Sequence, residues 1–378
     1  MNHEALVLTD VFPPQHGGSG KWLHELYARQ TPGQYIIAAG NSHGFDANSD
    51  DQYPQKIIRL KLDMPYRGIA NLNSLWNYTK QYRLLSNLVE KNPIKKIHAA
   101  RPLSEGLVAA AIKKTRRIPF YCFIHGEDIN VAKTSRELIT ATNFVLKSAD
   151  RLIANSNFSR NLLINDWGVA DSKTRVLHPG VDTQKFSHVK QRNARDGTLK
   201  LLTVGRLQRR KGQDTVIKAL PELTKIFPDV SYTIAGGGED LGRLQNLAEQ
   251  LGVENRVNFL GSFEDSELPS IYGAHDVFIL ANRDEGHDVE GFGIVLVEAQ
   301  AAGLPIIAGN SGGTSDTFSD GETGFLIDAE TCEPLVKALT TQLNTVKKRL
   351  AIGSRGREHV QKNLDWSTLT KKAEIILA

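Results

Sequence analysis

Two glutamates eight positions apart carry the clearest chemistry in this chain. Glu290 and Glu298 enclose a glycine-bracketed aromatic residue and an apolar run, in the order Glu290-Gly291-Phe292-Gly293-Ile294-Val-Leu-Val-Glu298. The glycines suit a turn where backbone approaches a ligand, and the apolar run predicts a buried helix directly after it. The free N–H groups that open such a helix attract phosphate oxygens, and both carboxylates can accept hydrogen bonds from sugar hydroxyls. An ordinary buried helix with two solvated glutamates has the same spacing, but it does not need the flanking glycines.

A pair of cations follows a predicted strand earlier in the chain. Arg206 and Lys211 lie five positions apart in Gly205-Arg-Leu-Gln-Arg-Arg-Lys211, just before a predicted helix. A planar guanidinium and a compact ammonium suit a pyrophosphate and can neutralise it as it departs. A solvated basic turn is the alternative. We expect Arg209 and Arg210, in the same stretch, to be exposed.

Two further stretches in the first half end predicted strands with polar or glycine residues. Gly17 and Gly18 follow the first strand and let backbone amides approach a phosphate or a sugar. Their spacing differs from the G-x-G-x-x-G dinucleotide fingerprint, and a plain turn is the alternative. His125 ends another strand, where a neutral imidazole can bind a sugar hydroxyl and Asp128 can contact an acceptor.

These motifs resemble those of the retaining glycosyltransferases of family 4. The Glu-x7-Glu spacing, the Gly-Arg…Lys-Gly spacing, the Gly-Gly loop and the His-Gly pair all have counterparts there. The resemblance implies a GT-B fold, in which two Rossmann-like doubly wound domains face each other across a cleft. It also implies that Arg206, Lys211, Glu290 and His125 are catalytic.

The resemblance implies a set of substrate-binding residues as well. The nucleobase is expected against the strand that contains Phe259, with recognition by backbone rather than side-chain atoms. The segment Asp288-Val289-Glu290 resembles the corresponding segment in a subset of the family. Members of that subset transfer hexoses to phosphoinositol lipids and polysaccharide intermediates. That subset includes users of UDP-sugars and of GDP-mannose. The whole substrate-binding set is Gly17, Gly18, Asp128, Gly205, Phe259, Gly291, Phe292, Gly293, Ile294 and Glu298.

Length and composition place the chain among soluble globular proteins with two domains. It has 378 residues, 40% of them hydrophobic and 23% charged, and only two cysteines. No apolar run approaches the ~20 residues that span a membrane, and a cytoplasmic protein is expected. Residues 56–117 hold 14 Lys and Arg against three Asp and Glu. This basic span predicts an anionic partner, such as a lipid head group, an anionic membrane at the inner face, a phosphorylated acceptor or nucleic acid. With the resemblance added, the expected partners are a nucleotide-sugar donor and a lipid-linked, phosphorylated or saccharide acceptor, and not nucleic acid.

Strand-like and helix-like runs alternate along the chain, as in parallel sheets covered on both faces. The alternation stops in a polar, aperiodic stretch and then restarts. We therefore expect an acceptor-binding domain over residues 1–184, a linker over 185–198, a nucleotide-sugar-binding domain over 199–362, and a C-terminal helix over 363–378 that returns to the first domain.

One absence bears on mechanism. The sequence contains no Asp-x-Asp and no cluster with metal-ligand spacing, so we expect no metal and no cofactor. Arg206, Lys211 and helix amides would then neutralise the departing diphosphate. The predicted function is transfer of a hexose, with retained configuration, from a nucleotide diphosphate sugar to an acceptor hydroxyl in polysaccharide or glycolipid synthesis. UDP-glucose is the favoured donor. A GDP-mannose-dependent mannosyltransferase, a sugar phosphorylase of the same fold, an NAD-dependent dehydrogenase and a non-catalytic binding protein are the alternatives.

Overall fold

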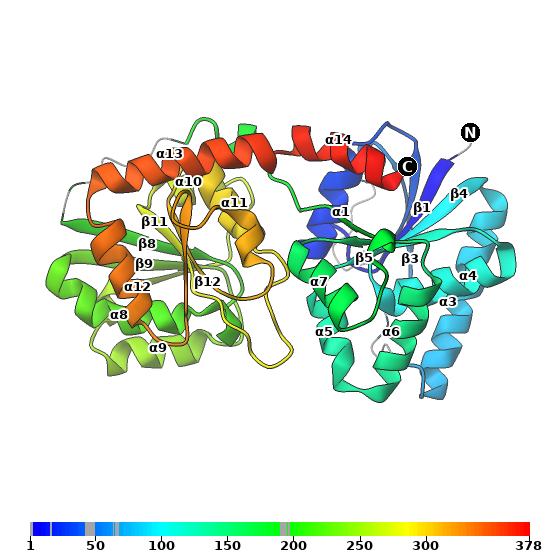
Figure 1. The fold of residues 1–378 in the computed structure, drawn as a ribbon, viewed down its shortest axis with the longest axis horizontal. Helices are drawn as coiled ribbons and strands as arrows, with labels where there is room; N and C mark the ends of the chain where they lie inside the picture. Colours follow the sequence, from blue (N-terminus) through cyan, green and yellow to red (C-terminus); the bar gives the residue numbers. More distant parts are fainter. Residues whose placement is uncertain are drawn as a thin grey trace. The chain divides into compact units, whose positions relative to one another are not determined.

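The computed structural model describes residues 3–15, 17–41, 50–62, 64, 68–189, 195 and 197–378. The chain forms two compact units. The first contains Met1–Pro179 together with Leu369–Ala378, and the second contains Gly180–Thr368. Figure 1 shows a sheet with helices on both of its faces in each unit.

The sheet of the first unit has seven strands in the order β3-β2-β1-β4-β5-β6-β7, and every pairing is parallel. The strands are β1 (His3–Thr9), β2 (Tyr35–Gly40), β3 (Lys56–Leu60), β4 (Ile94–Ala99), β5 (Phe120–Ile124), β6 (Arg151–Ala154) and β7 (Thr174–Val176). The central strands are buried on both faces, which explains why their sequences are continuous apolar runs.

Helices cover both faces of this sheet. They are α1 (Gly18–Ala28), α3 (Leu72–Lys91), α4 (Leu107–Arg116), α5 (Glu127–Val131), α6 (Arg136–Ser148) and α7 (Asn157–Asn165). Side chains of α3, α4 and α6 share one hydrophobic core with alternate residues of the strands. Helix α1 packs on the opposite face, where Trp22 meets Phe123 edge-on at a ring-centroid distance of 5.3 Å.

The sheet of the second unit has six parallel strands in the order β10-β9-β8-β11-β12-β13. They are β8 (Thr198–Val204), β9 (Asp229–Ala235), β10 (Val257–Gly261), β11 (Val277–Leu280), β12 (Ile306–Gly309) and β13 (Gly324–Ile327). The order reverses between β8 and β11, which is the point where ligands bind in open parallel sheets.

The helices of this unit are α8 (Gln213–Ile226), α9 (Leu241–Gln250), α10 (Leu268–Gly273), α11 (Ile294–Ala301), α12 (Glu333–Lys337) and α13 (Val346–Asn363). Two hydrophobic clusters fill the two sides of the sheet. Helices α8, α9 and α12 contribute to one, and α10, α11 and α13 contribute to the other. The predicted fold class, two Rossmann-like doubly wound domains, is confirmed.

The last helix, α14 (Trp366–Leu377), begins in the second unit and ends in the first. Within the first unit, Lys96 Nζ donates to the carbonyl oxygen of Leu377 at 2.9 Å, and the guanidinium of Arg151 donates to that of Ile376. Cations thus meet the carbonyl end of the helix, where the helix dipole favours positive charge. Residues 190–194 and 196 of the predicted linker lie outside the described residues.

No helix in the described part of the chain combines the length and the apolar character needed to cross a membrane.

Candidate active site

The glycine-rich loop between β11 and α11 places Glu290 at the carboxyl end of the second sheet. Gly293 caps the helix with φ +88°, and α11 begins at Ile294 as expected. Gly312, with φ +55°, lies so close to the loop that an added Cβ would be 1.9 Å from the carbonyl oxygen of Glu290. The N–H of Gly313 donates to that oxygen at 2.8 Å. The backbone of Glu290 is therefore held by a neighbouring turn that only glycine allows.

The carboxylate of Glu290 is the centre of a buried ion network. Glu290 Oε2 accepts from Arg210 Nη1 at 2.9 Å and from Lys211 Nζ. Arg210 Nε also lies 2.9 Å from Asp288 Oδ1. Burial opposes ionisation of Glu290, but Lys211 and Arg210 outweigh it and hold the pKa of this carboxyl below its usual value. Burial lowers the pKa of Lys211, and Glu290 acts against that shift.

Arg210 corrects one expectation. We expected this side chain to be exposed, but it is only 5% exposed because it turns inward to satisfy two carboxylates. Arg209 is exposed, as expected. Sequence gave no signal that separates the two arginines, since both lie in a short 3₁₀ helix, Arg209–Lys211, whose direction depends on the fold.

Arg206 lies beside this network but outside it. The side chain is exposed on the loop after β8, and it forms no ion pair within 4.0 Å with any residue in the described part of the chain. Its charge nevertheless contributes to the lowered pKa of Lys211, after burial and the charge of Arg210. The loop backbone is fixed, since Gln213 Nε2 donates to the Arg206 carbonyl at 3.1 Å. An exposed guanidinium next to a buried ammonium is an arrangement that can bind a phosphate group.

Glu298 lies one turn into α11 and is 7% exposed. Its Oε2 accepts a hydrogen bond from Tyr272 Oη at 3.1 Å, a contact that the sequence did not reveal. Burial, and then the charge of Glu298, raise the pKa of Tyr272. Tyr272 therefore remains a phenol and orients the carboxylate.

Two predicted contact residues direct their aromatic side chains toward the protein core. Phe292 is 3% exposed and packs with α10, α11 and α13, so at most its backbone can meet a ligand. Phe259 packs against the core on the side of α8 and α9. Large aromatic side chains next to a buried sheet gain more from core packing than from exposure. The side chain of Phe292 is thus corrected to a core residue, and the backbone contact expected at Phe259 stays a prediction. Gly291 stays in the loop beside Phe292.

In the first unit, His125 lies at the carboxyl end of β5. Its Nε2 is 2.8 Å from the carbonyl oxygen of Ala100, which can only accept, so Nε2 carries the proton and Nδ1 is an acceptor. Burial, followed by the charge of Arg101, lowers the pKa of His125 to about 4. The imidazole is therefore neutral near pH 7, and Nδ1 can accept a hydrogen bond from a hydroxyl.

Asp128 has a local structural task. Its carboxylate accepts from the backbone N–H groups of His125 (3.1 Å) and Ile129 (2.8 Å), so it ties the first turn of α5 to the end of β5. Gly17 and Gly18 are exposed at the start of α1, as a loop that presents backbone amides requires. A positively charged side chain also lies at this first turn of α1, because Arg101 Nη2 donates to Ser19 Oγ at 2.9 Å.

Two family models match the chain. Residues 33–185 match "Glycosyltransferase Family 4", and residues 184–359 match "Glycosyl transferases group 1". The chain is similar to the GDP-mannose-dependent alpha-(1-6)-phosphatidylinositol monomannoside mannosyltransferase of Mycobacterium tuberculosis H37Rv, with 29% identity over 97% of this chain and 96% of that protein. It is 31% identical to the D-inositol 3-phosphate glycosyltransferase of Corynebacterium glutamicum strain R, over 81% of this chain and 75% of that protein.

Among solved structures, Anabaena HepE in complex with UDP superposes with a TM-score of 0.81 at 21% identity, covering 99% of each chain. This likeness agrees with the fold. Together the family matches define the class: the chain is a glycosyltransferase. Within that class, it belongs to the group 1 glycosyltransferases of family 4.

Proposed function

We propose that this protein is a GDP-mannose-dependent mannosyltransferase that adds mannose, with retained anomeric configuration, to a hydroxyl of a glycolipid or polysaccharide intermediate. The observation that carries the proposal is the similarity to the mycobacterial mannosyltransferase over almost the full length of both chains. It favours the GDP-mannose alternative over UDP-glucose, the donor expected from the family resemblance.

The buried network supports a role in donor chemistry. Arg206 is exposed and Lys211 is 12% exposed at its side chain, and both are proposed to neutralise the diphosphate. Glu290 holds Lys211 in place and is proposed to accept a hydrogen bond from the transferred sugar. Glu298, oriented by Tyr272, is proposed to accept from the ribose hydroxyls. His125 Nδ1 is proposed to accept from a sugar hydroxyl, while Gly17, Gly18 and Gly293 supply backbone amides.

The proposed reaction exchanges one bond at the anomeric carbon. The bond from C1 to the diphosphate oxygen breaks and its electron pair leaves with the diphosphate. The acceptor oxygen bonds to C1 on the same face and passes its proton to a departing phosphate oxygen. Pre-positioned cations stabilise the negative charge that develops on the diphosphate, which lowers the barrier.

Membrane association is part of the proposal. On α3, Leu72 is 83% exposed, Trp76 is 65% exposed and Leu75 is 47% exposed, with Lys80 over the Trp76 ring at 5.5 Å. An apolar strip beside basic side chains suits an anionic lipid surface. Of the three aromatic residues on α3, only Trp76 is exposed, because Tyr78 and Tyr82 pack against the core.

Donor use tests the proposal directly. Purified protein should bind GDP more tightly than UDP by calorimetry, and it should release GDP from GDP-mannose faster than UDP from UDP-glucose when supplied with a phosphoinositol mannoside acceptor. Tighter binding of UDP, with turnover of UDP-glucose, would refute GDP-mannose as the donor and leave the glycosyltransferase class intact.

A further inference from the structure

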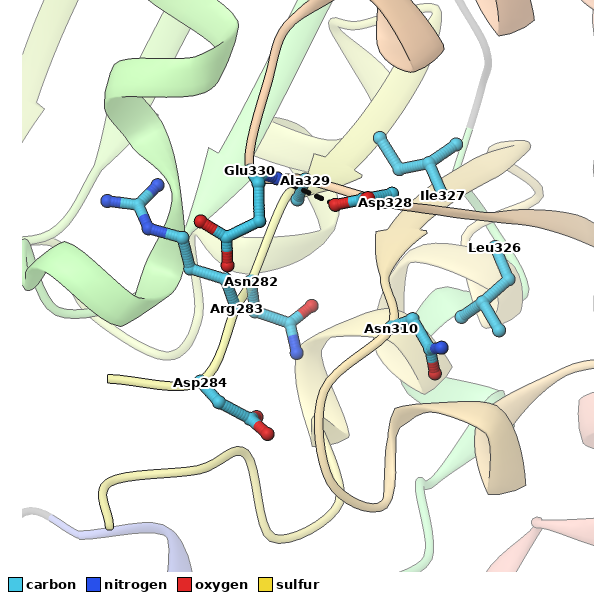
Figure 2. A pocket seen from close by; sticks show the side chains of 9 residues that line it. All are labelled: Asn282, Arg283, Asp284, Asn310, Leu326, Ile327, Asp328, Ala329 and Glu330. Atoms are coloured by element: carbon cyan, nitrogen blue, oxygen red, sulfur yellow. Dashed lines mark hydrogen bonds between the residues drawn. The ribbon is translucent and has the colours of Figure 1, made fainter. Parts of the chain in front are cut away.

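A pocket lies in the second unit, at the carboxyl ends of β11, β12 and β13. Its volume is about 320 Å³, within the range of small-molecule sites. The lining comprises Asn282, Arg283, Asp284, Asn310, Leu326, Ile327, Asp328, Ala329 and Glu330. Figure 2 shows these side chains around it. None of them belongs to the set assigned above to the donor.

A buried amide in this lining lacks a hydrogen-bond partner. Asn282 is 1% exposed, and its Nδ2 donates to Thr314 Oγ1 at 2.8 Å. Its Oδ1 is buried and has no partner among the residues that the structure describes. Burying an amide oxygen without a hydrogen bond is costly, so a donor is expected at this position. In Figure 2 the amide lies between the side chains of Glu330 and Asn310.

The polar lining consists mainly of hydrogen-bond acceptors. Asp284, Asp328 and Glu330 contribute carboxylates, and Asp328 Oδ1 accepts only from the local N–H of Glu330 among the described residues, at 3.0 Å. The single cation of the lining is already engaged, because the Arg283 guanidinium donates to Asp214 and Glu285 at 3.0 Å each. An anionic ligand is therefore disfavoured, and a ligand with several O–H donors fits.

The remaining wall of the pocket is apolar. Leu326, Ile327 and Ala329 lie on and after β13, next to the acceptors. A pyranose or a cyclitol presents hydroxyls at its rim and C–H groups on its faces, and this lining complements both.

The pocket is linked to the active-site loop. Ser311 Oγ donates to Asp284 Oδ1 at 2.6 Å and accepts from the N–H of Glu290 at 3.4 Å. One hydroxyl thus joins the pocket rim to the backbone of the glutamate at the centre of the ion network. A ligand that changes Asp284 would act on that backbone through a single side chain.

We propose that this pocket is a binding site for a neutral polyhydroxyl compound, a saccharide or a cyclitol, separate from the site of the nucleotide diphosphate. Asn282, Asn310 and Glu330 accept hydrogen bonds from its hydroxyls, and Leu326 contacts its C–H face. The site does not depend on which donor the enzyme uses.

Saturation-transfer NMR on the full chain, with GDP present, tests this site. The probes are methyl α-D-mannopyranoside, methyl α-D-glucopyranoside and myo-inositol, which distinguish a saccharide from a cyclitol. At least one of them should bind. Asn310→Ala and Glu330→Ala should each weaken that binding about tenfold, the effect of losing one hydrogen bond. Glu254→Ala, at an exposed position remote in sequence, is the matched control.

Both pocket residues are exposed, so the variants should keep the thermal midpoint and the GDP affinity of the wild type. Absence of binding by all three polyols, or binding that survives both pocket variants, would overturn the site. Displacement of the polyol by putrescine or Mg²⁺ at low concentration would show that the acidic lining takes a cation, and would overturn it as well. GDP binding and GDP-mannose turnover, measured on the same samples, report separately on the proposed function.

Discussion

At the scale of single residues, the two basic side chains of the donor loop have different environments. Lys211 is held by Glu290 in a buried pair, whereas Arg206 is exposed and forms no ion pair with a described residue. A buried pair fixes geometry more than it adds stability, because desolvation offsets much of the attraction. In the proposed reaction, Arg206 can follow the charge of the diphosphate as it departs.

This difference leads to a matched test on one loop. Arg206→Ala should lower kcat by about 10- to 100-fold, the loss of a charge-assisted hydrogen bond of ~1.5–3 kcal/mol in the transition state. GDP affinity should change less. Arg209→Ala removes an exposed arginine three residues away and should stay within about twofold of the wild type. Steady-state kinetics with GDP-mannose measure kcat of both variants, and calorimetry measures their affinity for GDP. Equal losses in the two variants would show a general effect of surface charge.

His125 gives a prediction about pH. Because its pKa in the folded protein is lowered to about 4, the imidazole should stay neutral across pH 5–8. Unfolded histidine binds a proton near pH 6.5, so this residue's contribution to stability is full above that value and falls as pH decreases toward 4. The acidic limb of kcat/KM should therefore not contain a step near pH 6.5 that disappears in His125→Gln. Finding such a step would contradict the neutral acceptor role.

At the scale of elements, the loop of Glu290 depends on a turn from elsewhere in the sheet. Gly312→Ala would place a Cβ 1.9 Å from the Glu290 carbonyl at φ +55°, so it should destabilise the protein by at least ~2 kcal/mol beyond the control and reduce turnover. The control is Gly321→Ala, at φ +74° with no atom within 4 Å of the new Cβ. In that variant only the backbone strain of a positive φ remains, which should lower the free energy of unfolding by about 1 kcal/mol. Urea unfolding of both variants measures the difference; equal losses would mean that the turn does not constrain the loop.

Sequence predicted these elements well where pattern alone decides them. Apolar runs identified the central strands β1, β5 and β8, because strands buried on both faces read as continuous hydrophobic segments. The start of α11 at Ile294 followed from the glycines before it.

Side-chain direction within a loop was less predictable. Arg210 turns inward and Arg209 outward, and Phe292 enters the core, because each outcome depends on partners far away in sequence. The Ser311 link to Asp284 and the Tyr272 contact to Glu298 were missed for the same reason.

At the scale of the whole molecule, the first unit carries a basic span and an exposed apolar strip on α3. Wild-type protein should sediment with phosphatidylglycerol vesicles at low salt and less at high salt, since surface attraction is screened. Trp76→Ser with Leu72→Ser should weaken this several-fold. Ile375→Ser, at an exposed apolar position on α14 in the same unit, should not. Equal sedimentation with neutral phosphatidylcholine vesicles would refute the anionic surface as partner.

The proposed reaction needs positive charge at the place where the diphosphate leaves. A diphosphate that leaves from C1 develops charge that must be neutralised, and this chain offers Arg206, Lys211 and the N-terminus of α11. Turnover of GDP-mannose should therefore persist in excess EDTA, at a rate within about twofold of the untreated enzyme. If EDTA abolished turnover and Mg²⁺ or Mn²⁺ restored it, a divalent ion would be required to complete the neutralisation.

Because the proton is proposed to pass to the departing phosphate on the same face, the mannose should keep its α-configuration. NMR of the fresh product distinguishes the α-linkage from the β-linkage by its one-bond C1–H1 coupling, and a β-linked product would rule out the same-face mechanism.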